Sequence, residues 1–99
     1  MDLIYHVTTK AEWEAARKKG FCTAPSLETE GFIHCSEEHQ LKGVLERYYS
    51  GKKDLVKLVI DPEKLKTVLK YELAPSVHEN FPHVYGPINA DAVVNVEAI

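Results

Sequence analysis

The chain contains short segments in which hydrophobic and polar residues follow a regular pattern, and each segment has the length of one strand or one helix. Residues 2–7 alternate weakly and lead directly into Thr8 and Thr9, which predicts a strand that ends where a helix begins. Glu12 follows Thr9 at the spacing of a capping box, and Gly20 ends the segment. The pattern therefore predicts a strand followed by a helix.

A second strand and helix are expected further along the chain. Residues 31–35 form a short apolar run, and Ser36 is the candidate N-cap of the next helix. Apolar residues then recur at helical spacing at positions 41, 44, 45 and 48 until Gly51. Residues 20–31 have no period, so we expect an exposed connection there.

The second half of the chain predicts strands and little helix. Strands are expected at residues 55–60, 67–73 and 92–99, with a helical turn at 62–65. Residues 74–87 are expected to form a polar loop. Two helices and five or six strands of this size predict one α+β domain spanning residues 1–99.

Composition narrows the function classes. Twelve Lys and Arg against fifteen Asp and Glu give a net charge of −3, so no long-range field attracts nucleic acid. No apolar run approaches the roughly 20 residues of a membrane span, and the N-terminal residues do not resemble an export signal. Cys22 and Cys35 are too few for a disulfide framework. We therefore expect a cytoplasmic protein with reduced thiols and neither a membrane nor a nucleic acid as its partner.

Five histidines lie at predicted strand ends or in loops. His6 and His34 each precede by two residues a hydroxyl residue near a predicted helix start, Thr8 and Ser36. If the two strands are neighbours, these four side chains converge on one cleft beside helix N-termini, which favour phosphate groups. The alternative, which spacing alone favours, is that the hydroxyls cap helices and the histidines are half-buried strand residues.

The stretch 81–88 combines aromatic residues, a histidine and two prolines. Proline restricts a loop, which would hold His83 ready for hydrogen bonding and Tyr85 ready to stack on a planar ligand. The alternative is an aromatic loop that folds back onto the core.

Metal and thiol chemistry have weaker signals. His34, Cys35 and His39 lie within six residues, and Cys22 could join them as a zinc ligand. Adjacent strand residues point to opposite faces, so we expect no metal. A nucleophilic pair of Cys35 with His6 or His83 has no local signature. Glycine patterns for binding phosphate or dinucleotides are absent from the sequence.

Four segments in order carry a family resemblance. They are Ile4-Tyr5-His6-Val7-Thr8, Gly31-Phe32-Ile33-His34-Cys35-Ser36, Tyr71-Glu72 and Phe81-Pro82-His83-Val84-Tyr85-Gly86-Pro87-Ile88. The chain resembles domain of unknown function family 952 from about residue 3 to residue 94. That family is similar in fold to the ADP-ribosyltransferases, so the resemblance implies a split antiparallel sheet with two main helices and a cleft that takes NAD as its substrate.

The resemblance also implies roles for single residues. His6 resembles the strand-end histidine that holds the adenosine ribose of NAD, and Glu72 is the candidate for the glutamate that aids cleavage of the nicotinamide bond. His83 is the second catalytic candidate, as acid or base. The expected substrate-binding set is His6, Thr8, His34, Ser36, Tyr85 and Gly86.

These observations leave several functions open. The first is binding of NAD or a related nucleotide, with transfer of ADP-ribose as the reaction. The second is a non-catalytic module that binds a nucleotide or phosphorylated metabolite. The third is an activity like that of the RNA 2'-phosphotransferases, although their marker arginines have no counterpart because Arg17 and Arg47 fall inside predicted helices. A protein partner that meets residues 81–88 is a fourth.

Overall fold

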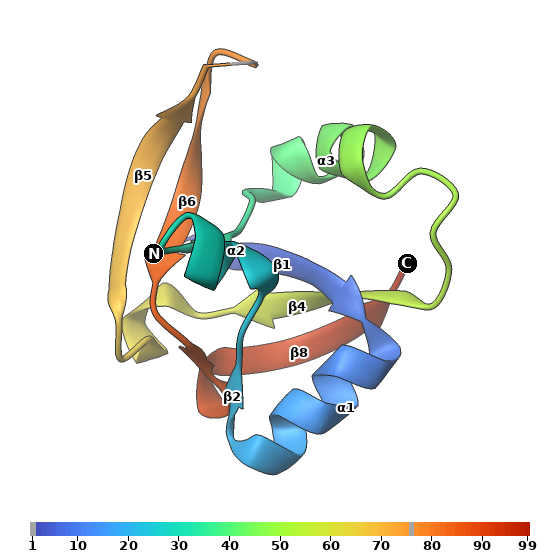
Figure 1. Ribbon diagram of the computed structural model, residues 1–99, viewed down its shortest axis with the longest axis vertical. Coiled ribbons are helices and arrows are strands. Elements are labelled where there is room, and N and C mark those ends of the chain that lie inside the picture. Colours follow the sequence, from blue (N-terminus) through green and yellow to red (C-terminus); the bar gives the residue numbers. More distant parts are fainter. Residues whose placement is uncertain (1, 76) are drawn as a thin grey trace.

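Two three-stranded antiparallel sheets frame the computed structural model, which describes residues 2–75 and 77–99 (Figure 1). In the first sheet, β4 (Leu55–Ile60) lies between β1 (Ile4–Thr9) and β8 (Val93–Ala98). All of β4 except Lys57 is buried. The apolar run read as the clearest strand is thus the centre of this sheet.

The second sheet has the order β3 (Ile33–His34), β6 (Glu79–Tyr85), β5 (Val68–Ala74). The predicted loop at 74–87 is therefore wrong, because Glu79–Tyr85 within it form β6. Phe81, Pro82, His83 and Val84 are all buried in this strand. Pro82 and His83 are unusual in a strand. Hydrophobic and polar residues do not alternate clearly along β6, because both faces of the strand are covered.

The two sheets are joined by backbone hydrogen bonds at one point. The Tyr5 N–H donates to the Ser36 carbonyl at 2.8 Å, and the Ser36 N–H donates to the Tyr5 carbonyl at 2.8 Å. One residue earlier, the Cys35 N–H donates to the Pro82 carbonyl at 3.0 Å. Segment 33–36 thus bridges β1 and β6, and the predicted α+β class with antiparallel pairing is confirmed.

Ser36 is not a helix cap, which corrects the second predicted helix start. Ser36 is extended, and the following 3₁₀ turn begins with Glu37, whose carboxylate and the Gln40 side chain form a capping box. The helix proper, α3 (Leu41–Tyr48), starts after that turn. The next residue, Glu37, therefore has the capping role that the sequence pattern assigned to Ser36.

The first helix follows the sequence pattern closely. In α1 (Lys10–Lys19) the Thr9 hydroxyl accepts the Glu12 N–H at 3.1 Å, and Gly20 adopts the left-handed conformation that ends the helix. The following connection holds a one-turn helix that the pattern did not predict, α2 (Pro25–Thr29). Two short strands, β2 (Phe21–Cys22) and β7 (Ile88–Asn89), also pair. Within the described residues, no helix has the length and apolarity to cross a membrane.

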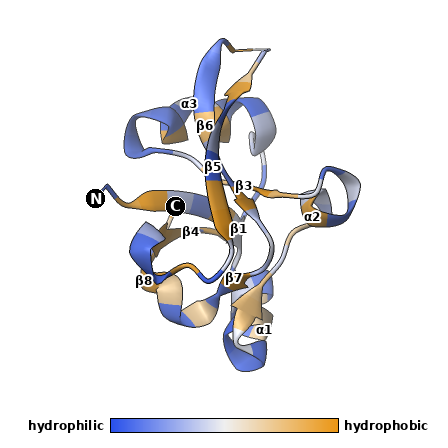
Figure 2. Ribbon diagram, turned by 90° about the vertical axis from the view of Figure 1, so that its left-hand side faces the viewer, coloured by the Kyte–Doolittle hydropathy of each residue, from blue (hydrophilic) through white to orange (hydrophobic). Residues whose placement is uncertain are grey.

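Side chains alternate across β1 and divide between two cores. Ile4 packs in the main core with Leu58 and Ile60 of β4, and residues of the second sheet and β7 complete it. Val7 packs on the other face in a smaller cluster with Leu41 of α3. Figure 2 shows that β5 of the second sheet also carries both hydrophobic and hydrophilic residues along its length.

Candidate functional site

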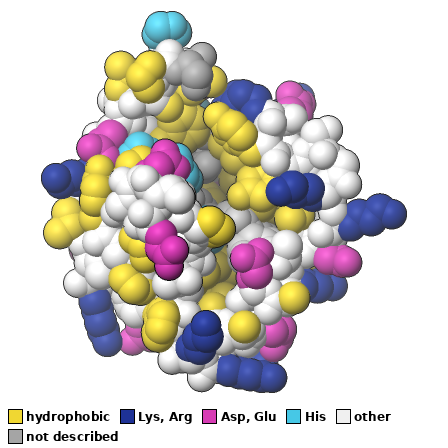
Figure 3. Space-filling view, in the orientation of Figure 1, with side chains coloured by type: hydrophobic (Ala, Val, Ile, Leu, Met, Phe, Trp, Pro, Cys, Tyr) yellow, Lys and Arg dark blue, Asp and Glu magenta, His cyan; other side chains and the backbone are white. Residues whose placement is uncertain are grey.

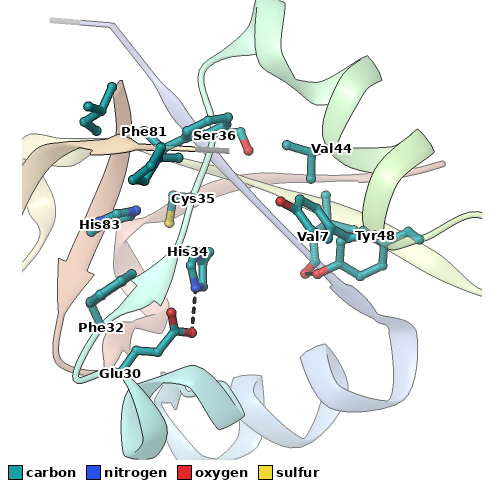
Figure 4. A pocket seen from close by; sticks show the side chains of 14 residues that line it. Val7, Glu30, Phe32, His34, Cys35, Ser36, Val44, Tyr48, Phe81 and His83 are labelled. Carbon is teal, nitrogen blue, oxygen red and sulfur yellow. Dashed lines mark hydrogen bonds and ion pairs between the residues drawn. The ribbon is translucent and has the colours of Figure 1, made fainter. Parts of the chain in front are cut away.

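A pocket of about 520 Å³ lies between α3 and the strands of the second sheet. It opens as a hollow in the middle of the face shown in Figure 3. Val44, Tyr48 and Tyr49 line it on the α3 side, and Val7 of β1 lies at its base. The opposite wall carries Phe32, His34, Cys35, Ser36, Phe81 and His83 (Figure 4). Aromatic and apolar side chains therefore form most of its surface.

Four rings form an aromatic–histidine cluster, Phe32, His34, His83 and Tyr85. The first three of these rings line one wall of the pocket. Phe32 stacks on His83 with ring centroids 4.0 Å apart and an interplanar angle of 18°. His34 meets Phe32 at 4.9 Å and His83 at 5.4 Å, both edge-on. The register explains the contact, because His34 of β3 is paired with His83 of β6.

Glu72 holds the inner histidine of the cluster. Its Oε1 lies 2.9 Å from His83 Nδ1 and also accepts the Tyr85 hydroxyl. These bonds, Tyr85 first and His83 second, hold the pKa of Glu72 below its usual range. The anionic carboxylate favours the tautomer in which His83 Nδ1 carries the proton, which leaves Nε2 free to accept one.

Glu30 pairs with the outer histidine of the cluster. Its Oε2 lies 2.9 Å from His34 Nε2, and about half of each side chain is exposed. Figure 4 shows this pair at the edge of the pocket. Each histidine of the cluster thus has its own carboxylate, Glu30 beside the exposed His34 and Glu72 beside the buried His83.

Ser36 and Cys35 differ in what they offer to a ligand. Ser36 is 5% exposed, and no hydrogen bond of its hydroxyl is found among the described residues. No fully buried side-chain nitrogen or oxygen of those residues lacks a partner, so this hydroxyl is not fully buried. Cys35 is 2% exposed, and burial raises the pKa of its thiol far above neutral pH. Ser36 is therefore a free polar group in the wall, whereas Cys35 lacks the thiolate that the Cys–His nucleophile hypothesis needs.

His6 and Thr8 lie on the other face of β1 from Val7, so they do not line this pocket. His6 Nδ1 donates to the His34 carbonyl at 2.8 Å, and burial lowers the pKa of its imidazole. The Thr8 hydroxyl donates to Glu12 Oε1 at 3.4 Å. His6 and His34 therefore do not converge on one cleft as expected. His6 instead forms a hydrogen bond with the backbone of His34 on the side away from the pocket.

Glu72, Tyr85 and Gly86 also lie outside the residues that line the pocket. Glu72 contacts the pocket-lining His83 directly, and Tyr85 is connected to His83 through its hydrogen bond to Glu72. Gly86 has φ +150°, and a Cβ there would come within 2.6 Å of Thr67 Cγ2. Close packing against Thr67 accounts for this glycine.

The structure adds site residues that sequence reasoning did not single out. Glu30 lies four residues before His34 in the sequence, and this spacing was the only feature from which their contact could have been predicted. Tyr49 follows the apolar face of α3 and donates its hydroxyl to the Val7 carbonyl at 3.3 Å. Among residues 2–75 and 77–99, no three His, Cys, Asp or Glu side chains are placed to hold a metal ion.

Comparisons with known proteins place the chain in a family. The family model described as "Protein of unknown function (DUF952)" matches residues 7–96. The crystal structure of protein CC0527 from Caulobacter crescentus is 31% identical, and the match covers 97% of this chain and 84% of that chain with a TM-score of 0.87. The solution NMR structure of CC0527 gives a TM-score of 0.77 at 31% identity over 97% of this chain and 83% of that chain. The comparison with curated proteins gives no match.

Proposed function

The chain belongs to the DUF952 family, and we propose that its pocket binds a nucleotide, NAD or a close relative, by a planar ring and its attached ribose. The observation that carries this proposal is the His83–Glu72 pair set in an aromatic pocket wall. A second, finer part of the proposal is transfer of ADP-ribose, which is the reaction that the sequence resemblance to the ADP-ribosyltransferases implies.

The shape and chemistry of the pocket favour a planar ring. Tyr48 lies across the pocket from Phe32 and His83 (Figure 4). Tyr49 and Phe81 also line the pocket, and aromatic rings stack on flat ligands. The Ser36 hydroxyl supplies one unpaired polar contact inside. A few polar groups in an apolar pocket are the usual arrangement of a small-molecule site.

The charges of the pocket favour one end of NAD. Glu30 is the only charged residue among those that line it, and no Lys or Arg joins it in the described part of the chain. A pyrophosphate would find no cation there, whereas the nicotinamide ring of NAD is positively charged and suits aromatic faces and a carboxylate. We therefore assign the pocket to the nicotinamide ribose and leave the phosphates toward solvent.

The transfer step follows from this placement. The bond between nicotinamide and the ribose anomeric carbon breaks, nicotinamide leaves with the bonding electrons, and an acceptor hydroxyl forms the new bond. Nε2 of His83 takes the proton of that hydroxyl. Glu72 acts as a positioning residue that fixes the His83 tautomer and stabilises its charged form, as a carboxylate does in a catalytic triad.

Binding without chemistry is the second candidate. Phe32 stacks on His83 and only 8% of the His83 side chain is exposed, which suits a structural role for this histidine. The RNA 2'-phosphotransferase reaction has less support, because an RNA phosphate needs cations that the described pocket lining lacks.

Binding is tested by thermal unfolding with NAD, ADP-ribose and nicotinamide riboside. A ligand at about one hundred times its Kd adds about 2.7 kcal/mol, which raises Tm by about 10 °C or more in a chain of this size. Val44→Trp fills the pocket and should remove the shift, whereas Lys42→Trp, on the exposed side of the same helix, should keep it. Equal shifts in both variants would place the ligand elsewhere.

Chemistry is tested by release of nicotinamide from NAD. Glu72→Gln should lower the release rate about 100-fold while the Tm shift with NAD persists. Glu97→Gln, an exposed carboxylate paired with Lys57, is the matched control and should leave the rate unchanged. Ligand binding with no release in the wild type would support the non-catalytic candidate.

A further inference from the structure

The strand β5 is an unprotected sheet edge. It pairs with β6 on one side, and no element lies beyond it in Figure 1. Three of its apolar residues are about half exposed, Val68 at 57%, Tyr71 at 47% and Leu73 at 57%. An exposed edge with apolar side chains is a template for pairing with another strand.

The backbone register shows which groups of β5 face outward. The Pro82 carbonyl accepts the Cys35 N–H, so the polar backbone groups of Pro82 face β3. Its partner Tyr71 therefore belongs to a pair without hydrogen bonds between β5 and β6, and its own N–H and C=O point away from the sheet. Leu69 and Leu73 follow the same period of two, which gives three residues with outward donors and acceptors.

The residues of β5 on the two sides of Tyr71 complement each other, because Lys70 and Glu72 have opposite charges and Leu69 and Leu73 are both apolar. We propose that β5 pairs antiparallel with β5 of a second copy of this chain, with Tyr71 on the two-fold axis. Lys70 then lies opposite Glu72 of the partner subunit, Leu69 opposite the partner's Leu73, and Val68 opposite the partner's Ala74. Opposite charges and matched apolar side chains both stabilise cross-strand pairs.

Other registers have less of this complementarity within β5. An axis at Lys70 or at Glu72 places like charges opposite each other, and an axis at Leu73 leaves both charges opposite uncharged residues. An axis at Leu69 leaves Lys70 opposite Val68 and pairs Glu72 only with Lys66, which lies outside the strand. The axis at Tyr71 also makes the outward groups of Leu69, Tyr71 and Leu73 the hydrogen-bonded positions. Lys70 and Glu72 then occupy the closer pairs without hydrogen bonds.

Lys70 is available for this contact. It forms no ion pair within the described part of the chain, and its Nζ lies 5.2 Å from the centroid of the Tyr85 ring. Glu72 is the carboxylate that holds His83. A dimer would therefore bring Lys70 of the partner subunit beside each proposed site, a consequence that rests on the proposed function, whereas the pairing itself does not.

The test is the molar mass by sedimentation equilibrium from micromolar to millimolar protein, without any ligand. The wild type should approach twice the 11.2 kDa mass of the chain. Tyr71→Pro should remain at the monomer mass, because proline removes an outward N–H that the β5–β6 ladder does not use. Tyr71→Thr keeps that N–H and should still dimerise. A monomeric wild type at millimolar concentration, or dimerisation of Tyr71→Pro at the wild-type level, would overturn the proposal.

The charges test the register. Lys70→Glu should weaken dimerisation at least about tenfold, and the double variant K70E/E72K should restore it because the opposite charges are exchanged. Lys66→Glu, outside the strand, is the matched control and should dimerise as the wild type does. Failure of the double variant to recover, with circular dichroism showing it folded, would reject the axis at Tyr71. Nicotinamide release and the NAD-induced Tm shift are measured separately, so failure of the dimer leaves the pocket assignment intact.

Discussion

Burial decides the chemistry of the two cysteines. Each is 2% exposed, and burial raises the pKa of Cys22 to about 11 and that of Cys35 further. We expect neither thiol to react with Ellman's reagent at pH 8 on a timescale of minutes, and both to react at once in denaturant, because only an exposed thiolate is a nucleophile. Fast labelling of Cys35 in the folded chain, located by mass spectrometry, would reopen the hypothesis that Cys35 is a nucleophile.

His6 gives the fold a sensitivity to acid. Burial lowers its pKa, so below about pH 6.5 the unfolded chain binds a proton that the folded chain resists. The free energy of unfolding should therefore fall as the pH drops from about 6.5 toward the folded pKa, and His6 should contribute no pH dependence above that window.

Urea unfolding at pH 7.5 and pH 5.5 measures this contribution. The His6→Asn variant retains a side-chain donor for the His34 carbonyl but does not titrate, so it should lose less stability than the wild type between the two pH values. An equal loss in both proteins would show that other groups cause the acid sensitivity.

At the scale of elements, capping residues made α1 predictable. Thr9 and Gly20 each interact with the backbone of neighbouring residues, so their roles can be predicted from the local sequence alone. Thr9→Ala should lower the free energy of unfolding by about 1 kcal/mol, whereas Thr9→Ser should stay within a few tenths. Urea unfolding of the two variants checks this, and a loss as large in Thr9→Ser would show that the Thr9 methyl group, not its hydroxyl, stabilises the helix.

The strand β6 escaped prediction for a reason that concerns distant parts of the chain. His83 is buried because Glu72 and Phe32 meet it there, and Pro82 is tolerated because its position makes no hydrogen bond to β5. Neither contact is visible in a local pattern. The histidine, serine and aromatic positions of the pocket wall could be singled out from sequence, but the separation of His6 from His34 required knowing on which face of β1 each core lies.

At the scale of the whole molecule, the main core joins both sheets. Ile4, Leu58 and Ile60 come from the first sheet, and Ile33 and Val84 come from the second. Backbone bonds between Tyr5 and Ser36 connect the sheets beside that core. Both sheets should therefore unfold as one cooperative unit, and the pocket between α3 and the second sheet should exist only when both are formed.

Native-state hydrogen exchange tests this with Ile33→Ala, which removes a fully buried side chain from the second sheet. The variant should lower the exchange free energy of the Leu58 amide in β4 and of the Val84 amide in β6 by the same amount, about 2–5 kcal/mol. Leu3→Ala, at a residue 40% exposed, should change either value by less than about 0.5 kcal/mol. If only Val84 lost protection, the second sheet would open separately from the first, and a ligand could then enter or leave the pocket without unfolding β1 and β4.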